Sequence, residues 1–318
     1  MVLSWNVAFA HTPDTPTDNE SLATAYTISN PTKSWAIYAE LHEGQEAQYY
    51  EFELPPNERL FAQLFVPPGE DSRFNPNLVI MGPGITSQDT VPAYVETAEN
   101  VGIALQIGQR PSSVTYEPFT PSSFYELASF DQEVSAGGTY YVAVYEQSHG
   151  GRYGLAIGYK EEFGLDEFIR IPIDVIGIHQ WEGQSLLFIL APLLITLIAG
   201  FALLIWKRPT SLRGVFSGIG VLAGLLYLGS GFMMLTQMIL ALTAASPDVG
   251  VLLTAIFILI PILLAIAIFR LTIPRKQITV RVRIFMVVLG VIGLFAWAGL
   301  LVGPALALVG SVVPDKRF

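Results

Sequence analysis

The chain has 318 residues, of which 52% are hydrophobic and only 14% charged, and its mean hydropathy is +0.48. Because an average soluble domain is about 25% charged, this composition excludes an ordinary cytosolic enzyme. The lack of cysteine excludes disulfides, cysteine-ligated zinc and iron–sulfur clusters, and the net charge of −10 argues against a nucleic-acid partner, which would require a basic face.

The charged side chains divide the chain into two unequal halves. Residues 1–182 hold 25 acidic and 7 basic side chains, whereas residues 183–318 hold 2 acidic and 10 basic ones. The first half is polar and rich in turn-forming residues, and the second is a series of long apolar runs. Such a change in charge and hydropathy indicates a membrane boundary between the halves.

The N-terminal residues indicate export. Residues 1–10 end in an Ala-Phe-Ala tripeptide that matches a cleavage pattern, so we interpret them as the remnant of a signal peptide or as a minimal one, with an apolar tail as the alternative. Cleavage after Ala10 would make His11 the mature N-terminus. Since an amine and an imidazole together suit copper(II), His11 is the candidate metal ligand and copper the candidate cofactor, against the alternative of an exposed terminus. Residues 11–33 are expected to form a polar leader.

Residues 34–160 predict an all-β sandwich of the jelly-roll type. Short apolar and aromatic runs alternate with turn signals such as Pro55-Pro56-Asn57, and eight short strands with frequent turns are typical of such folds. The stretch 84–102 is expected to be a loop or a short helix. The expected strands are Ser34–Leu41, Ala47–Leu54, Arg59–Val66, Leu78–Met81, Ile103–Ile107, Phe124–Ala128, Thr139–Glu146 and Arg152–Tyr159.

Two of these runs carry a family resemblance. Gly138–Tyr145, a short polar loop and Gly151–Gly158 resemble the closing hairpin of pre-peptidase C-terminal (PPC) type domains, which are small jelly rolls appended to secreted bacterial and archaeal proteins. Ala47–Leu54 and Arg59–Phe65 are similar to the early strands of that family, in which a Tyr-x-Phe strand precedes a turn. The resemblance implies a jelly-roll fold and an accessory, binding or targeting role, and it brings no catalytic residues.

Residues 161–182 form an amphipathic junction between the two halves. We expect this segment either to lie on the outer membrane surface, with Trp181 at the level of the lipid headgroups, or to pack back under the sandwich. Because it lacks a Gly/Ser-rich linker, an ordered junction is favoured. His179 and Glu182 would share one face of a helix, where they could bind a cation or a lipid headgroup, although a polar anchor at the membrane interface is the simpler interpretation.

Residues 183–318 are expected to form an all-α bundle of four transmembrane helices. Crossing a bilayer takes roughly 20 apolar residues, and four runs without acidic or basic side chains approach or exceed that length, at about 183–206, 214–242, 249–269 and 284–306. Small residues let helix backbones approach closely in lipid. The glycines expected to have this packing role are Gly214, Gly218, Gly220 and Gly224 in the second run and Gly299 and Gly303 in the fourth.

The basic loops predict the orientation of the chain. Eight Lys and Arg residues lie in the loops 207–213 and 270–283, and none lies in the loop 243–250. Short loops rich in Lys and Arg remain in the cytoplasm. We therefore expect a multi-pass protein of the plasma membrane whose N-terminal half and C-terminus both lie outside the cell.

The motifs of common enzymes are missing from the sequence. It contains no G-x-S-x-G elbow, H-E-x-x-H pair, Walker loop or dinucleotide fingerprint after a strand. The leading hypothesis is therefore a non-enzymatic, membrane-anchored binding or scaffold module with an accessory or sensing role. Its partners would be the lipid bilayer, an external ligand, and a membrane protein or a second copy of the chain. The alternatives are a copper-handling protein that uses His11 and an oligomeric channel for small solutes.

Overall fold

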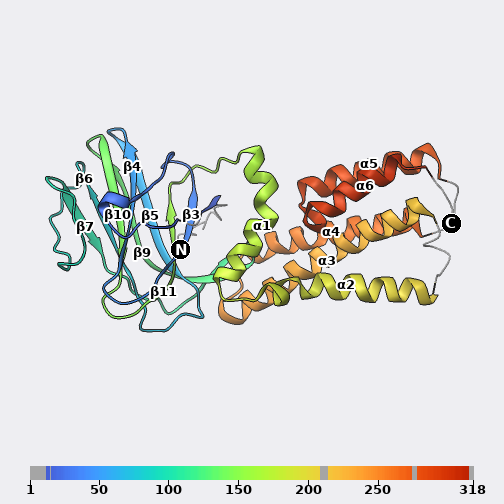
Figure 1. Cartoon of the computed structure of the whole chain (residues 1–318), viewed down its shortest axis with the longest axis horizontal. Coiled ribbons are helices and arrows are strands. Elements are labelled where there is room, and N and C mark those ends of the chain that lie inside the picture. The colour runs from blue at the N-terminus through green and yellow to red at the C-terminus, as the bar shows by residue number, and fades with distance from the viewer. Residues whose placement is uncertain (1–11, 15, 208–213, 274–277, 315–318) are drawn as a thin grey trace.

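The computed structural model describes residues 12–14, 16–207, 214–273 and 278–314. A β-sandwich occupies one end of the molecule and long helices the other, with helix α1 (Leu165–Trp181) crossing between them (Figure 1). This arrangement confirms the fold class predicted from the sequence. The expected signal-peptide remnant and His11 lie outside the described residues.

The sandwich has the strand order of a jelly roll. Its strands are β1 (Thr12–Asp14), β2 (Tyr26–Thr27), β3 (Trp35–Leu41), β4 (Ala47–Leu54), β5 (Glu58–Val66), β6 (Asn77–Gly82), β7 (Gly102–Gln106), β8 (Thr115–Glu117), β9 (Ser122–Val134), β10 (Gly138–Tyr145) and β11 (Gly151–Ile157). One sheet has the order β1-β3-β11-β5-β9-β8 and the other β2-β4-β10-β6-β7. Without the short edge strands β1, β2 and β8, the two four-stranded sheets interleave as in a jelly roll.

The segment expected to be a polar leader belongs to the sandwich. Strand β1 pairs in parallel with β3, and β2 pairs in parallel with β4. Between them, the side chain of Asn19 is buried and donates to the carbonyl oxygen of Tyr49, 3.1 Å away. The expectation of a separate leader is therefore wrong for residues 12–33 where they are described. Its cause is that edge strands of two or three residues carry no periodicity that a sequence can display.

The resemblance to a closing hairpin is also wrong in its pairing. β10 lies between β4 and β6, whereas β11 lies between β3 and β5 in the opposite sheet. The positions of both strands were predicted correctly. Their short connection, however, crosses from one sheet to the other and does not form a hairpin within a single sheet. The stretch 84–100 forms turns and bends rather than a short helix.

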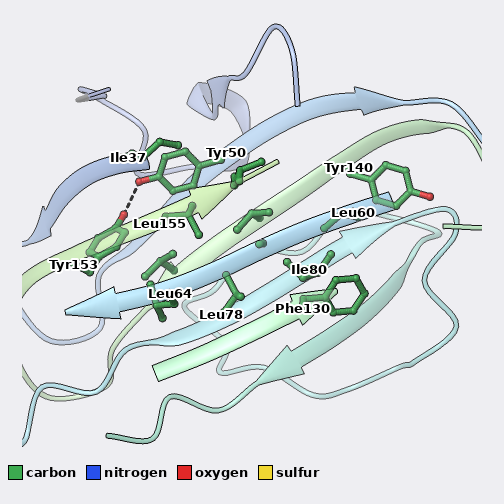
Figure 2. Packing of buried hydrophobic residues seen from close by; sticks show 14 of the residues in the cluster. Ile37, Tyr50, Leu60, Leu64, Leu78, Ile80, Phe130, Tyr140, Tyr153 and Leu155 are labelled. Atoms are coloured by element: carbon green, nitrogen blue, oxygen red, sulfur yellow. Dashed lines mark hydrogen bonds between the residues drawn. The ribbon is translucent and has the colours of Figure 1, made fainter. Parts of the chain in front are cut away.

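The sandwich core is filled by the side chains that alternate along the central strands. Tyr153, Leu155 and Ile157 of β11 all belong to this core. Figure 2 shows Tyr153 beside Tyr50, with Tyr140 of β10 at the opposite side of the view. The hydroxyls of Tyr50 and Tyr153 are hydrogen-bonded at 2.6 Å inside this core. Because buried polar groups need partners, this bond fixes how the two sheets face one another.

Three helices are long and apolar enough to cross a membrane. They are α2 (Leu186–Lys207), α3 (Val215–Ala244) and α4 (Gly250–Thr272). Helix α3 lies at the centre of the bundle. Of its most apolar 18-residue segment, 56% is buried, which is the largest share among the three helices. The outer helices α2 and α4 keep broad apolar faces exposed, as expected of helices that face lipid.

The fourth expected span is a bent pair of helices. α5 (Val280–Phe295) and α6 (Val302–Val312) meet at an angle of 119° across the short 3-10 turn η2 (Ala298–Leu301). Gly299 (φ 64°) lies inside this break, and Pro304 falls in the first turn of α6, where a missing N–H costs no helical bond. The expectation of one helix over 284–306 is therefore wrong, because this glycine and proline reverse the chain instead of kinking a continuous helix.

The bend places the end of α6 at the far end of the bundle. The guanidinium Nη1 of Arg283, in the first turn of α5, donates to the carbonyl oxygens of Ser311 (2.5 Å) and Val313 (2.9 Å). The start of α5 and the end of α6 therefore lie away from the sandwich, whereas the bend between them lies beside α1 (Figure 1). Among the described residues, the chain thus turns back before it returns to the sandwich, and the side of the membrane on which the C-terminus lies stays a prediction.

Candidate functional site at the junction of sandwich and bundle

Trp181, at the end of α1, fastens this helix to the sandwich. Its indole Nε1 donates to the carbonyl oxygen of Ala39 at 3.0 Å. Its ring lies edge-on to Tyr38 and Phe65, with centroid separations of 4.9 and 6.2 Å. The end of this segment therefore packs back against the sandwich, as one of the two expectations had it, and contact of α1 with the outer membrane surface stays a prediction.

Strand β8 makes a second contact, with the start of α4. The hydroxyl of Tyr116 donates to Thr254 Oγ1 at 2.8 Å, and Thr254 Oγ1 donates to the carbonyl oxygen of Pro118, also at 2.8 Å. Thr254 is fully buried and Tyr116 nearly so. One turn further along α4, Phe257 packs against Phe119. This buried hydroxyl chain fixes the edge of the sandwich to a helix of the bundle.

Glu117 lies beside this contact and has a perturbed acidity. The pKa of its carboxyl is raised to about 7, chiefly by burial and also by the negative charges of Asp248 and Glu161, against hydrogen bonds from the backbone N–H groups of Phe119 and Thr120. The group therefore titrates near neutral pH. No sequence pattern points to it, because an acidic residue in a turn-rich region resembles any solvated carboxylate.

His179 and Glu182 lie together at the end of α1, as their spacing predicts. The Nδ1 atom of His179 is hydrogen-bonded to Glu182 Oε2 at 2.8 Å, and the His179 ring is buried. Beside them, the side-chain amides of Gln184 and Gln237 pair through two hydrogen bonds of 2.9 and 2.8 Å. This pair joins α3 to the segment that precedes α2.

These polar groups border a cavity of about 310 Å³ between the sandwich and the bundle. Loops of the sandwich form one wall, and the start of α2 and the end of α3 form the other. The lining residues are Pro67, Pro68, Gly69, Pro121, Ser122, Ser123, Glu182, Gln184, Phe188, Gln237, Leu240, Ala241, Thr243 and Ala244. Of the residues singled out in the sequence, the structure brings Glu182 to this cavity, with His179 hydrogen-bonded to it from behind.

The glycines expected at helix contacts occupy different environments. A methyl group added to Gly224 would meet the ring of Phe269 in α4. Methyl groups on Gly299 and Gly303 would meet the ring of Tyr227, which α5 and α6 enclose. Gly218, in contrast, has open space on its side-chain face, so its spacing from Gly214 is not used in a contact within the described chain. Gly220, next to Thr272, resembles Gly224 in its setting.

The described residues hold no group of three or more His, Asp or Glu side chains that could bind a metal ion together. Comparison with models of known protein families gave no match. A search of curated proteins gave no match either.

Proposed function

We propose that the protein is a membrane-anchored binding or sensing module, with its sandwich outside the cell and its bundle in the plasma membrane. The observation that carries this proposal is the polarity of the molecule: the acidic sandwich lies at one end of the bundle, and the basic helix ends at Lys207, Arg270 and Arg283 lie at the other. Because basic loops remain in the cytoplasm, this polarity favours a sandwich on the outer side.

The docking of the two parts supports a sensing role. Trp181 and Tyr116 connect the sandwich to α1 and α4 through buried hydrogen bonds. A movement of the sandwich on ligand binding would therefore be transmitted through these contacts to the membrane helices. The excess of carboxylates on the exposed half favours a neutral or cationic ligand over an anionic one. The apolar outer faces of the bundle are available to a membrane subunit or to a second copy of the chain.

Orientation is tested by labelling single cysteines, which the natural chain lacks. Ser148→Cys, Thr279→Cys and Pro314→Cys lie at exposed positions on the sandwich, at the start of α5 and beyond α6. An impermeant maleimide should label only the first in intact cells and all three after permeabilisation. Labelling of Thr279→Cys alone in intact cells would reverse the orientation, and labelling of Pro314→Cys together with Ser148→Cys would mean that the bent pair crosses the membrane.

Binding by the sandwich is tested by photo-crosslinking in native membranes. A photoreactive residue at Ile107, which is 63% exposed on the sandwich, should give a discrete protein or ligand adduct. The same residue at Ile198, on the lipid-facing side of α2, serves as the control and should give lipid adducts. If neither Ile107 nor a set of other exposed sandwich positions gave a discrete adduct, the binding role would be contradicted.

A further inference from the structure

The cavity between sandwich and bundle contains polar groups that lack partners. Ser122 and Ser123 are only 9% and 8% exposed, and both line the cavity. Within the described chain, neither hydroxyl has a hydrogen-bond partner. Both hydroxyls are therefore available to a ligand in the cavity.

Glu182 adds a third unpaired acceptor. Its side chain is 13% exposed, and its Oε2 atom accepts from His179 at 2.8 Å and from Gln184 at 3.4 Å. The other oxygen, Oε1, has no partner among the described residues. No Lys or Arg is among the residues that line the cavity. The nearby guanidinium of Arg152 is already paired with Glu70 and donates to the carbonyl oxygen of Trp181. The lining itself carries the carboxylate of Glu182, which disfavours an anionic group and favours a cationic one.

The opposite wall of the cavity is apolar. Phe188 of α2 is 47% exposed, and it lies with Leu240 and Ala244 of α3 where the bundle begins. If α2 and α3 cross the membrane as proposed above, this wall is level with the outer headgroups and continues into the acyl region. A molecule that enters the cavity therefore meets polar acceptors at one end and hydrocarbon at the other.

We propose that this cavity binds the primary ammonium group of an amphipathic amine, with its hydrocarbon chain along Phe188 and Leu240. A primary ammonium has three N–H donors and no acceptor. It can donate both to Glu182 Oε1 and to a serine hydroxyl of the lining. A quaternary ammonium such as that of choline carries the same charge but cannot donate, so it satisfies neither acceptor.

The test is lipid retention by the full-length protein in phosphatidylcholine nanodiscs, measured by native mass spectrometry. The probes are phosphatidylethanolamine, phosphatidylglycerol with the same chains, and dodecylamine. Phosphatidylethanolamine should be retained in preference to phosphatidylglycerol and to the host lipid. Retention of dodecylamine as well would mean that the ammonium alone suffices, whereas retention of dodecylamine without phosphatidylethanolamine would make a free amine the ligand.

Two variants test the residues that hold the ammonium. Glu182→Gln should weaken retention by about tenfold or more, because it removes the charged acceptor. Ser122→Ala with Ser123→Ala should weaken it without changing the charge. Ser129→Ala, at an exposed position of the same strand β9, is the matched control and should retain the lipid. The serine pair keeps the test valid if Glu182→Gln fails to fold.

Equal retention of phosphatidylglycerol and phosphatidylethanolamine would overturn the proposal, as would retention unchanged in both variants. The inference depends on the membrane placement of α2 and α3, but its failure is distinguishable from a failure of that placement. A chain that labels with the expected orientation and retains no amine contradicts only the ammonium site. A chain that is released from membranes without detergent contradicts the proposed function itself.

Discussion

Tyr227 shows how strongly a single residue can determine the shape of the bundle. Its hydroxyl donates to the carbonyl oxygen of Leu289 at 3.2 Å, and its ring is fully buried between α3 and the bent pair. Gly293, Gly299 and Gly303 leave the space that the ring fills. The spacing of Gly299 and Gly303 was visible in the sequence, but their common neighbour was not, because it lies in another helix.

Gly303→Ala should destabilise the bundle. The added methyl carbon would lie 2.5 Å from the Tyr227 ring carbon Cε1, and overpacking of this kind costs about 1–3 kcal/mol. The measurement is the thermal midpoint of the purified protein in detergent. Gly218→Ala, which adds the same methyl group in open space, is the control and should not lower the midpoint. Equal effects of the two changes would contradict the contact with Tyr227.

Glu117 should make stability depend on pH near neutrality. Its pKa is raised from 4.5 to about 7 in the folded chain, so the folded state holds the proton more tightly than the unfolded state. The free energy of unfolding should therefore decrease as pH rises from 4.5 to about 7, and it should level off above that value. Glu117→Gln should reduce this decrease.

The comparison for Glu117 is between the natural chain and the variant, because Asp174 in α1 also has a pKa raised by burial and contributes in the same direction. Subtracting the two pH profiles of the unfolding midpoint isolates Glu117. A difference that does not vary across this pH range would show that the carboxyl is solvated.

At the scale of elements, α1 is a helix with two different exposed faces. Leu165, Ile169 and Ile173 recur every four residues and are 85%, 58% and 70% exposed. Asp166 and Arg170 form an exposed charged stripe beside them. Such a helix fits an interface, where apolar side chains enter the acyl boundary and charged ones remain among headgroups.

Single cysteines on α1 should therefore report different surroundings. A polarity-sensitive dye on Ile173→Cys should emit at shorter wavelength in liposomes and be quenched by lipids that carry a quencher in their chains. The same dye on Asp166→Cys should report water. If both positions responded alike, α1 would not lie at the interface in the orientation described here.

The elements also show which features a sequence displays. Long apolar runs and alternating strands are local patterns, so α2, α3, α4 and most of the main strands were predicted within a few residues, whereas β9 extends to Val134 beyond the expected end at Ala128. The break at Gly299 depends on Tyr227 and Ser230 of α3, whose hydroxyl accepts from the Gly299 N–H at 2.8 Å. The cavity depends on two loops and two helices that are distant in the chain. Neither feature is encoded by neighbouring residues.

At the scale of the whole molecule, the sandwich and the bundle should unfold together. Thr254→Val would leave the Tyr116 hydroxyl and the Pro118 carbonyl without this buried partner, at a cost of about 1–3 kcal/mol. Combining it with Tyr116→Phe should recover part of the loss, because the unpaired hydroxyl is removed as well.

This coupling is measured by calorimetry in detergent on both single variants and the double variant. Thr236→Val is the control, because the Thr236 hydroxyl donates to the carbonyl oxygen of Phe232 in the same helix at a half-buried position. A strictly additive double variant would indicate that the contact between β8 and α4 does not join the two parts energetically.

The bent pair has a consequence for how the protein is assembled in the cell. Helix α6 has 11 residues and, at about 1.5 Å per residue, is too short to cross a hydrocarbon core of about 30 Å. The insertion machinery therefore cannot integrate it as an independent segment. During synthesis α3 precedes α5 and α6, so the Tyr227 ring lacks its packing partners Gly293, Gly299 and Gly303 until both later helices have been made. Biogenesis should then contain a late folding step within the bilayer, and a nascent chain halted before that step should be a preferred substrate for membrane quality control.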